Sequence, residues 1–450
     1  MPAALNLMGG KPHKKLLELH QQYGDVVRIG PNELAFAHTD AWREICGHLK
    51  QGQPENGKDP KYLDEESNKS VIAASRERHG PLRRMLSHAF SARAMAEQQP
   101  LINRYIDLLM QRLRERGENG MKALDMVEWY NWTTFDIIGD LAFGESFGCL
   151  ENSKSHPWVD ILFDSMKYYP IMQALRDFPM FKVLKPILLA LFMPRDLLRK
   201  RQTSVEFSRE TLHKRINLGT ERPDFVEAML KKRDGYTMTD LEMIDNSVLL
   251  TTAGSETTAT TLAATTYLLC SHPDILDKLK VEVRSTFKGV DEIGLNSVQQ
   301  LRHMLAVLKE AMRVHPAVPI ALARRSPPGG THIAGKYVAG GTTLDIWQYA
   351  LYHSPKNFTC PDSFIPDRWL GDERFANDRK DLHQPFSYGP RNCIGMNLAY
   401  TEMQLILARI IWDFDLELAA DSAEWAKDQD VHFFWDKPPL NVYLKPRKTE

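Results

Sequence analysis

Cys393 lies in the part of the sequence best suited to chemistry, the stretch FSYGPRNCIG at 386–395. The cysteine stands just before a helix expected at 396–412, so N–H groups at that helix start can stabilise a thiolate. Phe386 can shield the sulfur from water, Gly389 begins a turn, and Gly395 lets a flat partner approach the backbone. A buried thiolate requires a metal or a cation. The pattern therefore favours an axial haem ligand over a buried structural cysteine.

The stretch AGSETT at 253–258 is a second candidate site, within a long apolar-rich helix expected at 239–269. Glycine and consecutive threonines are poor residues for a helix interior. We therefore expect a distorted turn here, with room for a small ligand. Glu256 and Thr257 place an acid and a hydroxyl side by side, as proton delivery to bound O2 would require. The alternative is a buried helix that is simply rich in threonine.

Glu310 and Arg313 form a third pattern, because a spacing of three places them on one helix face, where they can pair. Such a pair often arises by chance. The stretch FIPDRW at 364–369 adds a further cation, Arg368. If the three form a buried ion cluster, the loss of one member leaves a buried charge unpaired, which is severely destabilising.

With these three motifs in this order, the sequence resembles the cytochrome P450 family over most of its length. The resemblance implies the cytochrome P450 fold, mainly α with small β-sheets, as one haem-binding domain spanning 1–450. It implies haem b (iron protoporphyrin IX), with Cys393 as the metal ligand. It also implies a structural triad of Glu310, Arg313 and Arg368, and proton delivery by Glu256 and Thr257.

The two haem propionates would need basic partners. Arg83 is a candidate in the stretch HGPLRR, which matches the family's pattern of an aromatic residue followed four positions later by arginine. His79 stands where tryptophan is usual, and Pro81 is expected in the first turn of a helix. Arg324 is another candidate, although neighbouring Arg325 leaves the choice open. The other cofactor contacts expected from the resemblance are Ala253, Phe386, Gly389, Arg391 and Gly395.

The substrate pocket, by resemblance, has walls from 51–74, 247–258, 317–322 and the hairpin at 432–434. Its candidate lining is apolar, which predicts a small apolar substrate with few polar anchors. The alternative is that some of these residues belong to the ordinary core. The candidates are Leu249, Leu250, Ala253, Val318, Ile320, Ala321, Phe433 and Phe434.

The elements that must position these residues are mostly helical. Apolar residues recur at three- and four-residue spacing in several segments, while glycines after 316 separate short β-type runs. No segment is rich enough in Gly, Pro or Ser to divide the chain, so we expect one domain. Besides those named above, we expect helices at 102–116, 273–287 and 297–313, strands at 316–322 and 331–333, and a last hairpin at 431–442.

Composition narrows the function further. The 57 Lys and Arg nearly balance the 58 Asp and Glu, so no basic excess points to nucleic acid. The five cysteines are odd in number and widely spread, without a CxxC pair. Neither a disulfide framework nor a structural zinc site is indicated, which favours a reducing compartment.

Two strings, at 87–90 and 135–144, resemble filamentous-fungal members that tailor secondary metabolites. Such proteins carry an N-terminal membrane anchor and a proline-rich hinge, and the sequence as written shows neither. The oily segment at 178–193 is too short and too proline-broken to span a bilayer. It could lie in the membrane interface or form a buried helix hairpin. We expect the native protein at the cytosolic face of the endoplasmic reticulum membrane.

The resulting interpretation is a haem-thiolate monooxygenase that inserts one oxygen atom from O2 into a small apolar molecule. No GxGxxG pattern or flavin-like segment occurs, so electrons must come from a separate protein, by resemblance an NADPH-cytochrome P450 reductase. Two rivals remain: a haem-thiolate isomerase or dehydratase that does not use O2, and a non-enzymatic haem-binding protein. The adjacent Glu256 and Thr257 argue against the first.

Overall fold

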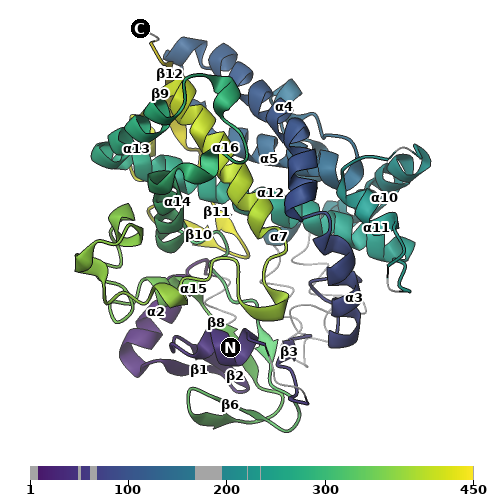
Figure 1. Cartoon of the computed structure of the whole chain (residues 1–450). Coiled ribbons are helices and arrows are strands. Elements are labelled where there is room, and N and C mark those ends of the chain that lie inside the picture. Colours follow the sequence, from purple (N-terminus) through teal and green to yellow (C-terminus); the bar gives the residue numbers. More distant parts are fainter. Residues whose placement is uncertain are drawn as a thin grey trace.

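A computed structural model of the chain describes residues 9–48, 52–60, 68–167, 195–219, 221–233 and 235–448. Helices dominate it, and small sheets lie at opposite ends of the molecule and between them (Figure 1), in agreement with the mainly helical chain that the sequence predicts. The described helices are α2 (Pro12–Tyr23), α3 (Arg76–Ser87), α4 (Ala92–Arg116), α5 (Met126–Phe143), α6 (Cys149–Asn152), α7 (Pro157–Lys167), α10 (Arg195–Asn217), α11 (Phe225–Leu230), α12 (Asp240–Ser271), α13 (Pro273–Thr286), α14 (Arg302–Val314), α15 (Gln348–Tyr352) and α16 (Met396–Asp413).

Helix α12 forms the centre of the helical body. Its start is fixed by a capping box, in which the Thr239 side chain accepts from the N–H of Glu242 while the Glu242 carboxylate accepts from the N–H of Thr239. The helix packs along α5, and a Cβ at Gly254 would lie 2.8 Å from Cδ1 of Ile138. Gly254 therefore permits close helix packing.

The expected distorted turn at 253–258 was wrong, because α12 is continuous from Asp240 to Ser271. Its hydroxyl side chains fold back onto carbonyls one turn earlier. Thr257 donates to the carbonyl of Ala253 at 2.7 Å, and Thr261 donates to that of Thr257 at 2.9 Å. These bonds satisfy the hydroxyls of Thr257 and Thr261 without breaking the helix.

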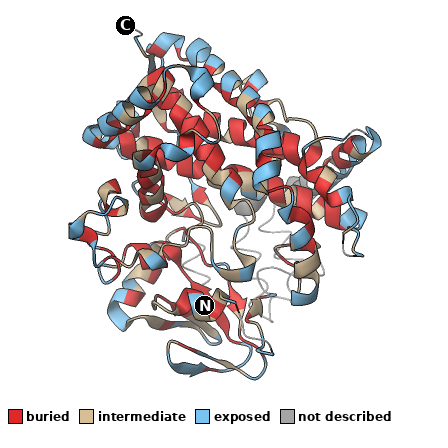
Figure 2. Ribbon diagram, viewed as in Figure 1, coloured by how far each residue is buried: buried red, intermediate tan, exposed pale blue. Residues whose placement is uncertain are grey.

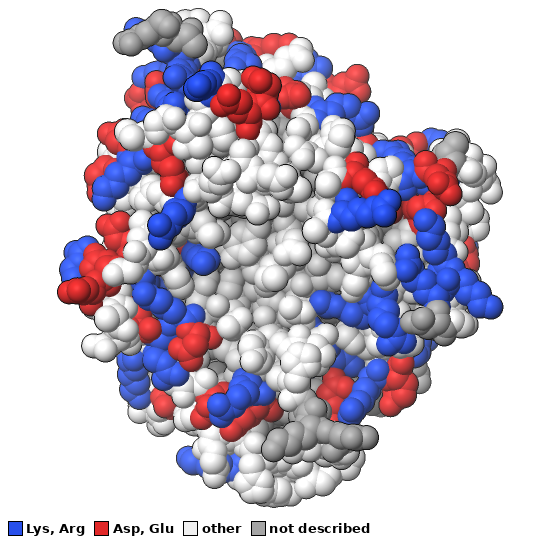
Figure 3. All heavy atoms as spheres, viewed as in Figure 1, with Lys and Arg blue, Asp and Glu red and all other residues white. Residues whose placement is uncertain are grey.

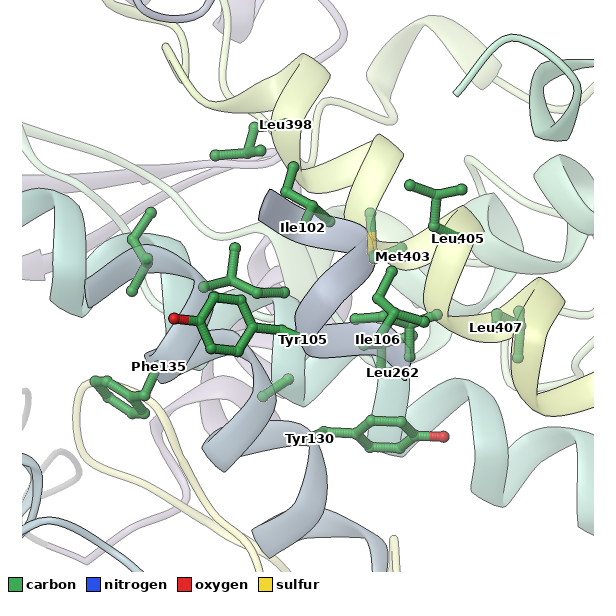
Figure 4. Packing of buried hydrophobic residues seen from close by; sticks show 14 of the residues in the cluster. Ile102, Tyr105, Ile106, Tyr130, Phe135, Leu262, Leu398, Met403, Leu405 and Leu407 are labelled. Carbon is green, nitrogen blue, oxygen red and sulfur yellow. The ribbon is translucent and has the colours of Figure 1, made fainter. Parts of the chain in front are cut away.

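The main hydrophobic core lies where α4, α5, α12 and α16 meet, and Figure 2 shows buried residues concentrated there. Figure 4 shows Ile106 of α4, Leu262 of α12 and Met403 of α16 side by side, and each is at most 1% exposed. The first residue of α16 follows the Cys393 loop, so this core fixes the helix that begins beside the candidate ligand.

The strands form four small sheets. One has the order β1-β2-β8-β5-β3, with β2 and β8 parallel and the other neighbours antiparallel. The others are β4-β12-β9, β6-β7 and β10-β11. The bounds are β1 (Val26–Gly30), β2 (Glu33–Phe36), β3 (Gly57–Lys58), β4 (Leu124–Asp125), β5 (Arg324–Arg325), β6 (Thr331–Ile333), β7 (Lys336–Val338), β8 (Thr343–Ile346), β9 (Phe414–Leu418), β10 (Asp430–Val431), β11 (Trp435–Asp436) and β12 (Asn441–Pro446).

Two strand predictions were wrong, both because of proline. No strand forms at 316–322, where Pro316 and Pro319 lack the N–H that a ladder needs. The last hairpin is shorter than 431–442 and consists only of β10 and β11. After Pro438 and Pro439 the chain leaves it, and β12 pairs with β4 and β9 instead.

Two further expectations concern helices. Pro81 was expected in a first helical turn, but α3 begins at Arg76 and contains Pro81 in its interior. Gly80 precedes it and has no Cβ to clash with the proline ring. The oily segment at 178–193 lies outside the described residues. Within the described part, no helix combines the length and the apolar character needed to cross a membrane.

Glu402 on α16 is buried in this core at 1% exposure, and its Oε1 has no hydrogen-bond partner among the described residues. Burial raises the pKa of Glu402 to about 8, while a hydrogen bond from Thr258 opposes the rise. In the folded protein, Glu402 is therefore mostly protonated at neutral pH.

We predict that Glu402→Gln stabilises the protein above pH 8 and leaves it nearly unchanged near pH 4.5. Folding raises the pKa, so between these values the folded state binds the extra proton and wild-type stability falls as pH rises. The gain should be on the order of 4 kcal/mol. Denaturant unfolding at both pH values measures it, and an equal effect at both would contradict the assignment.

Candidate active site

The Cys393 loop is held by backbone geometry. The N–H of Cys393 donates to the carbonyl of Phe386 at 2.8 Å, which closes the loop. Gly389 has a φ of +77°, and a Cβ there would lie 1.9 Å from the carbonyl oxygen of Cys46. Both features require glycine. The half-buried Phe386 ring packs on Tyr400 with centroids 5.0 Å apart, which ties the loop to α16.

The Cys393 side chain is exposed to solvent, although protein atoms lie densely around it. Burial raises the pKa of the Cys393 thiol, while the N–H of Gly395 and the charge of Arg83 lower it. Arg83 donates to the carbonyl and to the Oδ1 of Asn392, the latter at 2.7 Å. Neither opposing effect is a full counter-charge, so a stable thiolate here needs a metal ion.

Basic side chains from four segments gather near this loop. Lys58 on β3 pairs in register with Arg324 on β5, and the pKa of Lys58 is lowered by burial and by the charges of Arg324 and Arg391. The pKa of His79 falls to about 4, because of burial and the charges of Arg391, Arg83, Lys58 and Arg324. The structure thus brings together all four basic residues predicted from the sequence, and adds Lys58.

Arg324 and Arg325 are neighbours on β5 but differ in their ionic partners. Arg325 donates to Asp59 at 2.8 Å and is therefore already paired. Arg324 is 4% exposed and has no hydrogen-bonded or ionic partner among the described residues. Arg391 is bound by Glu55 at 2.8 Å and by the carbonyl of Ala74 at 2.8 Å. Arg324 is consequently the cation that most needs an anionic ligand.

This donor set fits a haem. One sulfur ligand would hold the iron, and a cluster of basic groups with too few carboxylates would receive the two propionates. Cys393, His79, Arg83, Arg324 and Arg391 would make these contacts. Lys58 could not be found from the sequence, because its only signal is the register that places it opposite Arg324.

The acid and the hydroxyl on α12 do not meet. Thr257 is half-buried beside the exposed Ala253, whereas Glu256 is 2% exposed on a different side of the helix. The Glu256 carboxylate accepts from Lys437 and, at 3.1 Å, from Thr260. Adjacent helical residues point about 100° apart, which explains the separation. Lys437 carries no motif in the sequence and is recognised only from this buried ion pair.

Glu310, Arg313 and Arg368 form one fully buried cluster, each with a side chain at 0% exposure. Arg313 binds Glu310 in two places, at 2.8 and 3.0 Å, and Arg368 reaches it at 3.3 Å. Asp378 also binds Arg368, and Trp369 donates to Glu310 at 2.8 Å. With Asp378 included, two acids balance two arginines, so the cluster is electrically neutral. Asp378 lies in an irregular loop and could not be predicted.

The pocket candidates occupy two environments. Leu250 is buried in the main core with Leu249 packed against it, and Ala253 is exposed. Ile320 and Ala321 belong to a smaller hydrophobic cluster, with Val318 and Phe433 packed on it. The half-buried rings of Phe433 and Phe434 lie 4.9 Å apart in the β10-β11 turn. A lining role is thus open for the exposed and half-buried members, whereas Ile320 and Ala321 also serve the core.

Comparison with known proteins agrees with this geometry. The model of the family Cytochrome P450 matches residues 3–444. Trichothecene C-15 hydroxylase of Fusarium sporotrichioides is 48% identical over 99% of this chain and 90% of its own length. Averantin hydroxylase of Dothistroma septosporum is 47% identical over 96% and 81%. Cytochrome P450 monooxygenase astA of Talaromyces wortmannii is 46% identical over 95% and 86%.

The chain therefore belongs to the cytochrome P450 family. It is a haem-iron monooxygenase of the fungal secondary-metabolite type, and it uses O2, a redox partner and a small substrate. The haem iron is the cofactor that the basic cluster and Cys393 fit.

We predict that Cys393→Ala abolishes the red-shifted Soret band of the reduced CO complex, because that band requires a thiolate opposite CO. Cys360→Ala is the matched control, since Cys360 is an exposed cysteine. A difference spectrum measures both variants. Survival of the band in Cys393→Ala would refute the ligand assignment.

We also predict that Lys437→Met costs about 3–5 kcal/mol of stability, because it leaves the Glu256 charge buried without its partner. The two side chains are 5% and 3% exposed. Lys445→Met is the control, because the Lys445 and Glu417 side chains are 55% and 59% exposed and an exposed pair contributes about 0–1 kcal/mol. If denaturant unfolding shows that both variants lose the same free energy of unfolding, the Lys437–Glu256 pair is not shielded from water.

Proposed function

We propose that this protein is a membrane-associated, single-domain monooxygenase that binds haem b through Cys393 and oxidises a small apolar secondary metabolite. Electrons come from NADPH-cytochrome P450 reductase. The observation that carries the proposal is the placement of one accessible sulfur beside a cluster of under-compensated basic groups. Apart from iron protoporphyrin IX, few cofactors need both a thiolate and several cations.

The bound haem supplies O2 activation, which the thiolate favours by donating electron density. The chain supplies position and charge. Arg324, Arg391, Arg83 and His79 would hold the propionates and fix the orientation of the ring. The neutral ion cluster around Glu310 joins α14 to the loop at 359–369 and so holds these two segments together.

Proton transfer is assigned to α12. The Thr257 hydroxyl donates to the Ala253 carbonyl in the resting chain, so rotation of this side chain would free it to orient a water. Glu256 would feed protons to that water after leaving Lys437. The ion pair with Lys437 therefore has to open before Glu256 can transfer a proton, and this opening becomes a step of the catalytic cycle.

The substrate class rests on the apolar candidates and on the relatives. Ala253, Val318, Phe433 and Phe434 offer carbon surfaces and few polar anchors. Two relatives are a trichothecene C-15 hydroxylase and an averantin hydroxylase. Both names support hydroxylation as the reaction of this chain.

A docking site for the reductase is supported by a cavity of about 500 Å³ next to the Cys393 loop. Lys309, Lys380 and His48 line it together with Asn392, and no acidic residue does. On the face shown in Figure 3, few charges occupy the centre, and basic and acidic side chains both lie around it, so the case for a basic surface rests on the lysines and the histidine of the cavity. Such a surface favours an acidic electron donor. Association with the endoplasmic reticulum is proposed on the resemblance to anchored fungal members.

The isomerase or dehydratase alternative is not favoured, because the relatives named above are hydroxylases and monooxygenases. A carrier without activity is disfavoured on the same ground. Dependence of product formation on O2 and on NADPH separates all three.

We predict that Thr257→Ala lowers the product formed per NADPH roughly ten-fold or more and releases peroxide, within the range that positioned proton-transfer groups contribute. Thr261→Ala is the control, since its hydroxyl makes the same back-bond one turn later. The assay uses a substrate identified by its haem spin-state change. Unchanged coupling in Thr257→Ala would remove this residue from the mechanism.

A further inference from the structure

A second cavity, of about 230 Å³, lies away from the haem site. It is enclosed by α2, the C-terminal half of α12, the end of α14, α15 and β11. None of the residues assigned to haem, protons or substrate lines it. Its wall includes His13, Tyr267, His315, Tyr349, Trp425 and Trp435.

Flat rings belong to nearly half of the lining residues. His13 meets Trp435 and Tyr349 edge to face, with centroids 4.8 Å apart in each case. His315 stacks on Trp435 at 4.2 Å and lies 5.8 Å from Trp425. These contacts connect the rings into one shell. A shell of this kind favours a planar guest that can offer both a ring face and a ring edge.

Two imidazoles in the shell have free nitrogens. His13 is 1% exposed, and its Nδ1 is buried without a hydrogen-bond partner among the described residues. His315 is 6% exposed; its Nε2 meets Gln429 at 3.1 Å, whereas its Nδ1 has no partner within the described part of the chain. Buried polar atoms are nearly always hydrogen-bonded to protein, water or a ligand, so these two nitrogens, in the wall of a cavity, are open to a guest that offers a hydrogen bond.

The acidic and basic groups of the lining lie at the rim, where Asp362 is 83% exposed and meets His353 at 2.8 Å. Burial is the largest cause that lowers the pKa of His13 to about 3 and of His315 to about 4, so both rings are uncharged at neutral pH. Asp428 and Lys14 pair with each other at 2.8 Å and are well exposed. A charged guest would lose its hydration without finding a counter-ion inside. A hydroxyl suits a neutral imidazole, because each can donate and accept.

We propose that this cavity is a second small-molecule site that binds a planar phenolic compound, with its hydroxyls on His13 and His315. The site is independent of the haem assignment. Among the described residues, no group of three His, Cys, Asp or Glu is arranged to hold a metal ion, so the histidines are assigned to an organic ligand.

The test uses the haem-loaded enzyme with an azole bound to the iron, which keeps phenols out of the haem pocket. Resorcinol is titrated by calorimetry. We expect saturable binding with a Kd of roughly 1 mM or below, the range open to a ligand of this size, and no change in the azole-bound Soret band. 1,3-Dimethoxybenzene, which cannot donate a hydrogen bond, should bind at least ten-fold more weakly.

His13→Phe keeps a ring in the wall but removes both nitrogens, and should weaken resorcinol at least ten-fold. His20→Phe is the matched control, because His20 is also buried on α2 but does not line the cavity. The proposal is overturned if resorcinol does not bind the azole-blocked enzyme, which would mean that water alone fills the cavity. Equal binding to wild type and to a folded His13→Phe would also overturn it. If His13→Phe fails to fold, the deciding comparison is made on the wild-type enzyme, where equal binding of resorcinol and 1,3-dimethoxybenzene overturns the proposal.

Discussion

The whole site depends on keeping the sulfur of Cys393 as an anion in a place where burial opposes charge. The backbone bond to Phe386 and the contact of Gly389 with Cys46 fix the sulfur, but neither neutralises it. Only a bound metal ion can do so fully. The fold therefore presents a ligand that becomes stable when iron arrives, and cofactor binding and folding of this loop are coupled.

The rest of the molecule repeats this balance of charge. Beneath the site, Glu310 and its acidic companion Asp378 neutralise two buried arginines. On α12, Lys437 neutralises Glu256. Within the described ranges, the basic cluster around Arg324 contains fewer carboxylates than basic groups. That imbalance marks where a dianionic cofactor belongs, and it distinguishes the binding region from the balanced ion pairs named above.

Much of the fold and of the candidate site was predictable from the sequence, because short motifs are determined by interactions between residues that are close in the chain. The Cys393 loop, the capping of α12 at Thr239 and the helical pairing of Glu310 with Arg313 all follow from neighbours in the chain. The rest depends on contacts between distant segments. Lys58 joins the basic cluster through strand register, and Lys437 meets Glu256 across 181 positions. The predicted break in α12 failed because Gly254 serves close packing on Ile138.

The most direct test of the account asks whether sulfur from Cys393 is bonded to haem iron. X-ray absorption at the iron edge should be recorded on the haem-loaded protein after Cys46, Cys149, Cys270 and Cys360 are replaced by alanine, so that one cysteine remains. The account predicts one sulfur at bonding distance from the iron. A first shell made only of nitrogen and oxygen, in a folded and haem-loaded protein, would contradict it.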